Sequence, residues 1–129
     1  MSYISIFNTK PFGKIREVCN RLFHTNYKDC RGMGWFKPRT FKKLKLDKYK
    51  LWFPKIGHNK ATGWENQLIK NETEIISKNS RKPGKAKPKQ ENITFAYIGN
   101  KYVFKGVFEL ISTNNGIERW KRNAKSITF

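Results

Sequence analysis

The chain has 129 residues, enough for one domain with its own hydrophobic core. Hydrophobic residues make up 37% and aromatic residues 15%, which excludes a disordered polycation. Lys and Arg number 28 against 9 Asp and Glu, and the resulting net charge of +19 favours nucleic acid over an anionic membrane as the partner. The sequence has no apolar run of about 18 residues. It also lacks a signal-peptide pattern at its start, so we expect a cytoplasmic protein with no membrane association.

The first part of the chain predicts a strand, a helix and a loop. Residues 3–7 (YISIF) alternate as a strand does. Residues 8–23 predict a helix with Asn8 or Thr9 as its N-cap and Pro11 in its first turn. Residues 24–41 read as a loop broken by Gly32, Gly34 and Pro38. The helix would bury one apolar stripe formed by Phe12, Ile15, Cys19, Leu22 and Phe23.

Residues 48–56 (KYKLWFPKI) predict a strand that ends or bulges at Pro54, which has no backbone N–H to donate. Neighbouring residues of a strand point to opposite faces of its sheet. Trp52 and Phe53 therefore cannot both enter a one-sided core. We expect Phe53 to face the core and Trp52 to face a helix, a loop or a ligand.

Three further segments precede the clearest element of the chain. Residues 62–71 (TGWENQLIKN) predict a short helix, because Thr62 and Glu65 have the spacing of a capping box. Residues 72–77 (ETEIIS) predict a short strand. Residues 78–90 (KNSRKPGKAKPKQ) predict a flexible basic loop, since they carry several lysines, one arginine and no acidic residue.

Residues 92–110 predict a β-hairpin in which Gly99 and Asn100 form a two-residue turn, assigned here to type II′. That turn fixes a register of opposed residues on one face, namely Tyr97 with Tyr102, Phe95 with Phe104, and Ile93 with Gly106, followed by Phe108 and Leu110. Gly106 would allow the strand to bend. Residues 117–123 and 124–129 would close the sheet. The fold class is therefore α+β: a curled or barrel-like mixed sheet with one N-terminal helix and one short helix, in a single domain spanning residues 1–129.

The sequence offers no recognisable catalytic constellation. The nine acidic residues form no paired or metal-binding pattern. The spacing of Cys19, His24 and Cys30, with His58 further along, matches no standard zinc site. Both cysteines are expected to be reduced thiols. We therefore expect no enzymatic activity, no metal and no cofactor.

Basic residues are concentrated in two stretches, residues 37–60 and residues 78–89, and aromatic residues lie within or next to the first of them. A charge run alone is often only a solvated face, but interleaved aromatics favour a groove for a polyanion. If about five to eight basic side chains contact phosphates, log affinity should fall with log salt at a slope of roughly −4 to −7. The candidate phosphate ligands are Lys42, Lys43, Lys45, Lys50, Lys55, Lys82, Lys85 and Lys87. Among the aromatics, Trp35 and Trp64 lie beside glycines in loop-like surroundings and are the better candidates for the mouth of a pocket.

The order of these parts resembles the PUA-like superfamily of small barrels, which includes PUA, ASCH, EVE, YTH and SRA domains. The resemblance rests on the strand ending in WFPK, the GWEN segment, the hairpin ITFAYIGNKYVFKGVFEL and the ERW of the last strands. The resemblance is strongest over residues 49–129. Within the superfamily, this part of the chain is similar to modules joined to HNH or modification-dependent restriction endonucleases. This resemblance implies a base-stacking pocket formed by Trp52, Phe53, Trp64 and Trp35, with Asn66 or Glu65 reading a base edge.

The combined prediction is a non-catalytic nucleic-acid-binding protein that holds an extruded or modified base beside a basic groove. The resemblance favours DNA over RNA, and it implies a separate nuclease or restriction-system partner for any cleavage. We expect a monomer or weak dimer. Two alternatives remain open. One is a ribosome-associated or RNA-binding basic protein without a base pocket, and the other is an ASCH-type hydrolase acting on a modified nucleoside.

Overall fold

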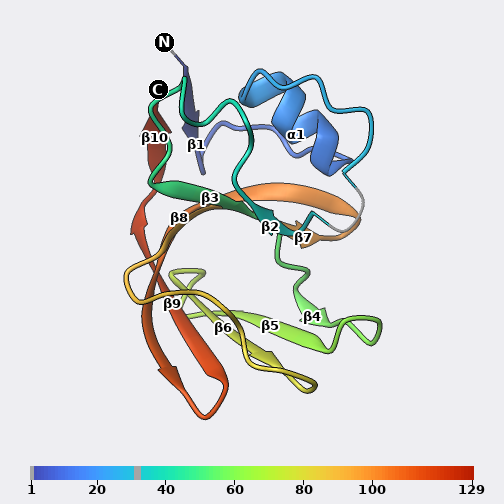
Figure 1. Ribbon diagram of the computed structural model, residues 1–129, viewed down its shortest axis with the longest axis vertical. Coiled ribbons are helices and arrows are strands. Elements are labelled where there is room, and N and C mark those ends of the chain that lie inside the picture. The colour runs from blue at the N-terminus through green and yellow to red at the C-terminus, as the bar shows by residue number, and fades with distance from the viewer. Residues whose placement is uncertain (1, 31–32) are drawn as a thin grey trace.

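The body of the protein is one curled, mixed sheet (Figure 1), seen in a computed structural model that describes residues 2–30 and 33–129. Its strand order is β2-β3-β7-β8-β9-β6-β5-β4. These strands are β2 (Trp35–Phe36), β3 (Tyr49–Trp52), β4 (Gly57–His58), β5 (Trp64–Ile69), β6 (Glu74–Asn79), β7 (Glu91–Ile98), β8 (Lys101–Asn114) and β9 (Ile117–Ala124). A second, two-stranded sheet pairs β1 (Tyr3–Ser5) with β10 (Ser126–Thr128), and α1 (Ile15–Leu22) is the one helix of the described residues.

The sheet curls so that its two ends approach each other. Only β3 and β7 are parallel, and every other neighbouring pair is antiparallel. The segment between β3 and β4 crosses from one end of the sheet to the other. Along it, Lys55 forms a β-bridge with Tyr97 of β7, and Ile56 forms one with Asn66 of β5. The predicted α+β fold with a curled sheet is confirmed.

The β7–β8 hairpin keeps most of its predicted register. Tyr97 opposes Tyr102 and Phe95 opposes Phe104, as expected. The turn type differs from the prediction, because Gly99 and Asn100 have φ values of 57° and 66°. Positive φ at both central residues defines a type I′ turn, whereas type II′ requires it only at the first. Asparagine adopts this left-handed conformation more readily than most residues, which is why the sequence accommodates either turn.

A bulge then changes the face on which β8 presents its side chains. The register shifts between Thr94 and Phe95, so Thr94 opposes Gly106 and Ile93 opposes Val107. Gly106 has a φ of 112°, and a Cβ there would lie 2.5 Å from the carbonyl oxygen of Ala124. Only glycine suits such a site.

As a result, the predicted single aromatic face is wrong. Phe95 and Phe104 belong to a first hydrophobic cluster, which lies under α1 and β1. Phe108 and Leu110 belong to a second cluster with Ile75 and Trp120. Because side chains alternate along a strand, one extra residue in the bulge moves everything after it to the opposite face.

The N-terminal helix is shorter than predicted. Lys14 is its N-cap, in an extended conformation, and the apolar positions that it buries are Val18 and Cys19. The expected start near Asn8 or Thr9 is wrong, because the Thr9 hydroxyl accepts a hydrogen bond from the backbone N–H of Ser5 instead. Phe12 pairs with Tyr102 through an isolated β-bridge, so this residue is held in extended conformation.

The second predicted helix is the strand β5. Its backbone pairs with β6 from Trp64 opposite Asn79 to Ile69 opposite Glu74. The Thr62 hydroxyl accepts from the N–H of Trp64, two residues on, and Glu65 forms an ion pair with Lys78 on β6. The capping-box spacing is therefore present in the sequence, but long-range pairing determines the conformation.

The remaining boundaries differ only slightly from the predictions. The 24–41 loop contains the short strand β2, and Gly32, one of its expected breakers, lies outside the described residues. β3 ends at Trp52, before Pro54, and β6 begins at Glu74. In the described part of the chain, no helix has the length and apolar character needed to cross a membrane.

Candidate functional site

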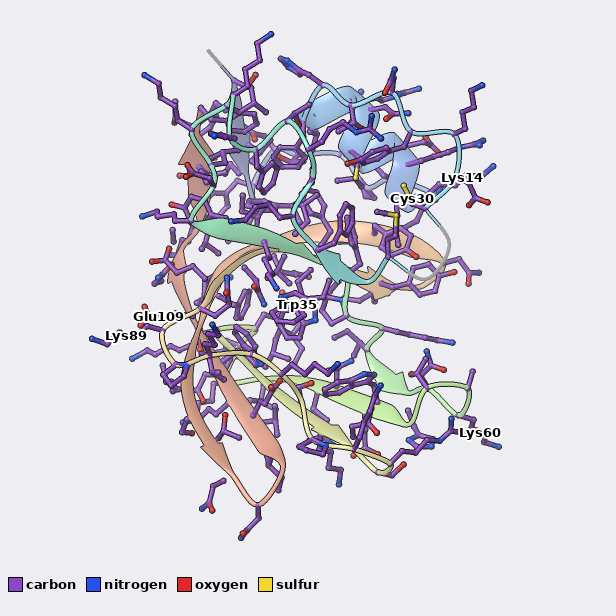
Figure 2. All side chains as sticks on the ribbon, viewed as in Figure 1. Lys14, Cys30, Trp35, Lys60, Lys89 and Glu109 are labelled. Atoms are coloured by element: carbon purple, nitrogen blue, oxygen red, sulfur yellow. The ribbon has the colours of Figure 1, made fainter. Side chains whose placement is uncertain are left out.

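A cavity of about 460 Å³ lies between the two ends of the curled sheet. One wall comes from β2, β3 and β7, and the other from β5, β6 and β9. Part of the segment between β6 and β7 also borders it, and Figure 2 shows Trp35 directed into the space between the two walls. The side chains that shape it are Trp35, Trp52, Lys55, Asn59, Thr62, Trp64, Asn66, Ser77, Lys85, Ala86, Asn92, Glu118 and Trp120.

All four tryptophans of the chain line this cavity. Trp35 and Trp52 are cross-strand neighbours on β2 and β3. The rings of Trp52 and Trp120 lie 4.9 Å apart between centroids, at an interplanar angle of 38°. Trp120 is buried, whereas the other three are half-buried and retain exposed ring surface. Exposed aromatic faces in a concave site are suited to stacking a flat ring.

Trp52 and Phe53 point to opposite faces, as strand alternation predicts. Trp52 lines the cavity and packs against the second cluster. Phe53 borders the cavity, but its ring stacks against Phe36 and Phe95 at centroid distances of 6.3 and 6.0 Å, inside the first cluster. The structure therefore places three of the four expected stacking residues, Trp35, Trp52 and Trp64, around the cavity, and places the ring of Phe53 in the core.

The two residues expected to read a base edge have other partners. Asn66 lies in the cavity wall, where its Nδ2 donates to the carbonyl of Lys55 at 3.1 Å and its Oδ1 accepts from the Ser77 hydroxyl at 2.6 Å. Glu65 lies on the outer face of the sheet, where it pairs with Lys78 at 3.1 Å. Because β5 is a strand, adjacent residues point to opposite faces, and Glu65 is directed away from the cavity that Asn66 borders.

The cavity instead contains two buried polar side chains that the sequence reasoning missed, Asn92 of β7 and Glu118 of β9. Asn92 is fully buried; its Oδ1 accepts from the indole Nε1 of Trp35 at 3.0 Å, and its Nδ2 has no partner among the protein atoms described. Glu118 is 4% exposed and accepts from Trp120 Nε1 at 3.2 Å. Burial raises the pKa of the Glu118 carboxyl, and the Trp120 hydrogen bond offsets this only in part. In the sequence, Glu118 lies two residues before Trp120 and so shares its face of a strand, but which face that is depends on long-range pairing.

The segment over residues 82–88, which we call the strap, closes one side of the cavity. Gly84 lies so close to the opposite wall that a Cβ there would be 2.2 Å from Glu118 Oε2 and 3.1 Å from the Trp64 ring. The Arg81 guanidinium anchors the start of the strap by donating to the carbonyls of Lys60 and Ala61, each at 2.7 Å. Within the strap, Gly84 and Ala86 are half-buried while the lysines between and after them are exposed.

The eight candidate phosphate ligands do not form one group. Lys55 and Lys85 line the cavity, and Lys50 Nζ lies 3.6 Å from the centroid of the Trp35 ring. Lys82 and Lys87 belong to the strap. The remaining three lie between β2 and β3, in a segment on the same side of β3 as α1 (Figure 1), away from the strap. These three are Lys42, Lys43 and Lys45.

Among the described residues, no three His, Cys, Asp or Glu side chains are grouped closely enough to hold a metal ion. Cys19 and Cys30 are both free and buried. Burial and the neighbouring Cys30 thiol raise the pKa of Cys19 to about 12, so this thiol stays protonated at neutral pH.

The fold and the cavity agree with a family of DNA-binding modules. The model of the SRA family, the SET and RING associated domain, matches residues 2–129, so the chain belongs to this family. The resemblance to PUA-like domains is thereby confirmed. Members of the SRA family are DNA-binding modules.

One solved structure with the same fold is "The 5-Hydroxymethylcytosine-Specific Restriction Enzyme AbaSI". It superposes with a TM-score of 0.74 at 20% sequence identity, over 98% of this chain. The match spans 42% of the AbaSI chain, so the two proteins are similar over less than half of that enzyme. No curated protein matches the chain.

Proposed function

We propose that this chain is a non-catalytic module that binds DNA and holds an extruded, modified cytosine in the cavity. The observation that carries the proposal is the combination of three half-buried tryptophans with two buried polar groups, Asn92 and Glu118, in one cavity. Aromatic faces supply stacking without base preference, whereas buried hydrogen-bonding groups supply selectivity.

The two polar groups are complementary to the edge of cytosine. This edge has an exocyclic amine that donates and ring acceptors beside it. A Glu118 carboxylate accepts, and the unpartnered Nδ2 of Asn92 donates. Thymine presents a carbonyl where cytosine has its amine, and a buried carboxylate would repel it. The cavity of about 460 Å³ also leaves room for a substituent on the base.

Two further features support DNA as the partner and a modified cytosine as the base that the cavity selects. The family to which the chain belongs consists of DNA-binding modules. AbaSI, which shares the fold, is described as specific for 5-hydroxymethylcytosine, and we extend modified-cytosine recognition to this chain as part of the proposal. Any cleavage would then be carried out by a separate nuclease.

The test is a binding series with matched oligonucleotides across a range of salt concentrations. The DNA duplexes differ only in carrying cytosine, 5-methylcytosine or 5-hydroxymethylcytosine at one position, and the same sequences are tested as RNA. We expect tighter binding to modified DNA, together with a steep salt dependence for every duplex. Equal affinity for all bases would contradict the proposal and leave the RNA-binding or packing alternative. Release of a free or altered nucleoside, followed by mass spectrometry, would instead favour the hydrolase.

A further inference from the structure

Three lysines lie on separate segments of the chain that each border the cavity through a neighbouring residue, namely Trp35, Trp52 and Ala86. Lys37 directly follows β2, Lys50 lies within β3, and Lys87 belongs to the strap. Burial lowers the pKa of Lys50, and the positive charges of Lys37 and Lys87 lower it further. The strand register places two of them side by side: Phe36 pairs with Leu51, so Lys37, the next residue of the chain, follows β2 at the level of Lys50.

This cluster is adjacent to the cavity wall that carries Trp35 and Asn92. Lys50 Nζ lies 3.6 Å from the centroid of the Trp35 ring, and Lys50 pairs in register with Asn92 on β7. Ala86, next to Lys87 in the chain, lines the cavity itself. The lysines thus flank the end of the cavity that contains the unpartnered Asn92 amide.

Within the described residues, none of the three lysines is paired with a carboxylate. The ion pairs of the described structure lie elsewhere, for example Lys78 with Glu65 and Lys105 with Glu72. Lys37 Nζ donates to the main-chain carbonyl of Asp47, which neutralises no charge. Lys50 contacts the face of Trp35, an interaction that leaves its positive charge in place.

Three unpaired ammonium groups beside a cavity form a site for a compact oxyanion. Phosphate fits best, because lysines bind it as point charges and its oxygens accept from several donors at once. The nearest phosphate to a base held among the tryptophans is one of the two that flank the same nucleotide. We propose that Lys37, Lys50 and Lys87 form a phosphate subsite, so that the cavity binds a whole nucleotide through its base and one flanking phosphate. This inference rests on the proposed function, because it requires a base in the cavity.

The test removes the phosphate charge and the lysine charge separately and together. A duplex with one 5-hydroxymethylcytosine is prepared with a neutral methylphosphonate on its 5′ side, on its 3′ side, or several nucleotides away. Affinity for each duplex is measured by fluorescence anisotropy with the wild-type chain and with Lys87→Gln, an exposed residue whose replacement leaves the core intact. Lys50→Gln is the second variant. Lys101→Gln, an exposed lysine on a separate groove beside α1, is a control with the same change in net charge.

For one of the two flanking positions, we expect the methylphosphonate to weaken wild-type binding by about tenfold. The same methylphosphonate should weaken binding by at most about twofold in Lys87→Gln and Lys50→Gln, because each variant has already lost a lysine contact to that phosphate. Lys101→Gln should retain the full loss. An equal loss in all four proteins at both flanking positions, with discrimination between cytosine and 5-hydroxymethylcytosine intact, would overturn the subsite but keep the proposed function. Absence of that discrimination in the wild-type chain would overturn both.

Discussion

Trp35 and Asn92, which are 57 residues apart in the sequence, are joined by a 3.0 Å hydrogen bond from the indole Nε1 to the amide Oδ1. This bond fixes the orientation of one aromatic wall of the cavity. It also holds the Asn92 amide so that its Nδ2 remains without a protein partner. A buried donor of this kind lowers the stability of the free protein and is available to a ligand acceptor.

The first prediction concerns how much stability the protein loses when the hydrogen bond between Trp35 and Asn92 is removed. Trp35→Phe leaves both polar atoms of Asn92 unpaired and should lower the free energy of unfolding by roughly 1–3 kcal/mol. Asn92→Leu removes the buried amide and leaves the indole donor of Trp35 unpaired. In the double variant neither partner remains, so its loss should be smaller than the sum of the two single losses. Urea unfolding of the four proteins measures this coupling, and strictly additive losses would show that the bond contributes nothing.

The second prediction separates stacking from core packing. Trp64 is half-buried at the cavity, so Trp64→Ala should weaken binding to modified DNA by about 1–3 kcal/mol if its ring stacks the base. Trp64→Phe, which keeps an aromatic face, should recover most of the affinity. Tyr3→Ala is the matched control, because Tyr3 is 58% exposed on β1, outside the cavity. Unchanged affinity in Trp64→Ala, with folding confirmed by circular dichroism, would contradict the stacking role.

The sequence predicts the aromatic part of this site better than its polar part. Trp52 could be assigned because alternation separates it from Phe53 within one short strand. Glu118 and Asn92 could not, because their faces depend on long-range register and on the bulges of β7, β8 and β9. The short helix predicted over residues 62–71 is wrong, because the capping-box spacing of Thr62 and Glu65 is a local signal, whereas pairing with β6 makes this segment the strand β5. Local patterns in the sequence indicate which residues of one strand share a face. Long-range pairing between strands determines which side chains from different strands come into contact.

The third prediction concerns which lysines contribute to salt dependence. Lys55→Gln and Lys85→Gln each remove a positive charge at the cavity, and each should reduce the magnitude of the log affinity–log salt slope by about 0.9 for a duplex. Lys42→Gln and Lys43→Gln remove the same charge from the segment on the α1 side of β3. These two should leave the slope nearly unchanged. A uniform reduction by all four variants would indicate that DNA contacts both sides of the sheet.

The fourth prediction follows from the raised pKa of Glu118. Because the carboxyl binds its proton more tightly in the folded than in the unfolded state, it destabilises the folded protein progressively as the pH rises above the unfolded pKa of about 4.3. Glu118→Gln removes this penalty while preserving the shape. The variant should therefore be more stable than the wild-type chain at neutral pH, and this advantage should vanish as the pH falls below the unfolded pKa.

Urea unfolding from about pH 4 to pH 8 measures this difference directly. The same variant should bind cytosine-containing and thymine-containing duplexes more equally, since the glutamine amide can both donate and accept. A stability difference that does not change with pH would show that the carboxyl has no altered affinity for its proton in the folded state. Retained discrimination between the two bases would show that Glu118 does not read the base edge.

The fifth prediction tests the contact between the strap and the cavity wall. In Gly84→Ala the added Cβ would lie 2.2 Å from Glu118 Oε2, so either the strap or the carboxylate must move. Gly84 has no left-handed φ, and the effect is therefore steric rather than conformational. We expect a loss of roughly 1–3 kcal/mol in stability, as for other overpacked sites, together with weaker DNA binding.

Gly34→Ala is the matched control, because Gly34 also borders the cavity but a Cβ there meets nothing within 4 Å. Shortening the opposing side chain should relieve the clash, so Gly84→Ala combined with Glu118→Ala should be more stable than the two single losses predict. If Gly84→Ala and Gly34→Ala behave alike, the strap moves away from Glu118 without a measurable loss of stability. In that case its lysines, rather than its close packing, would be its contribution to DNA binding.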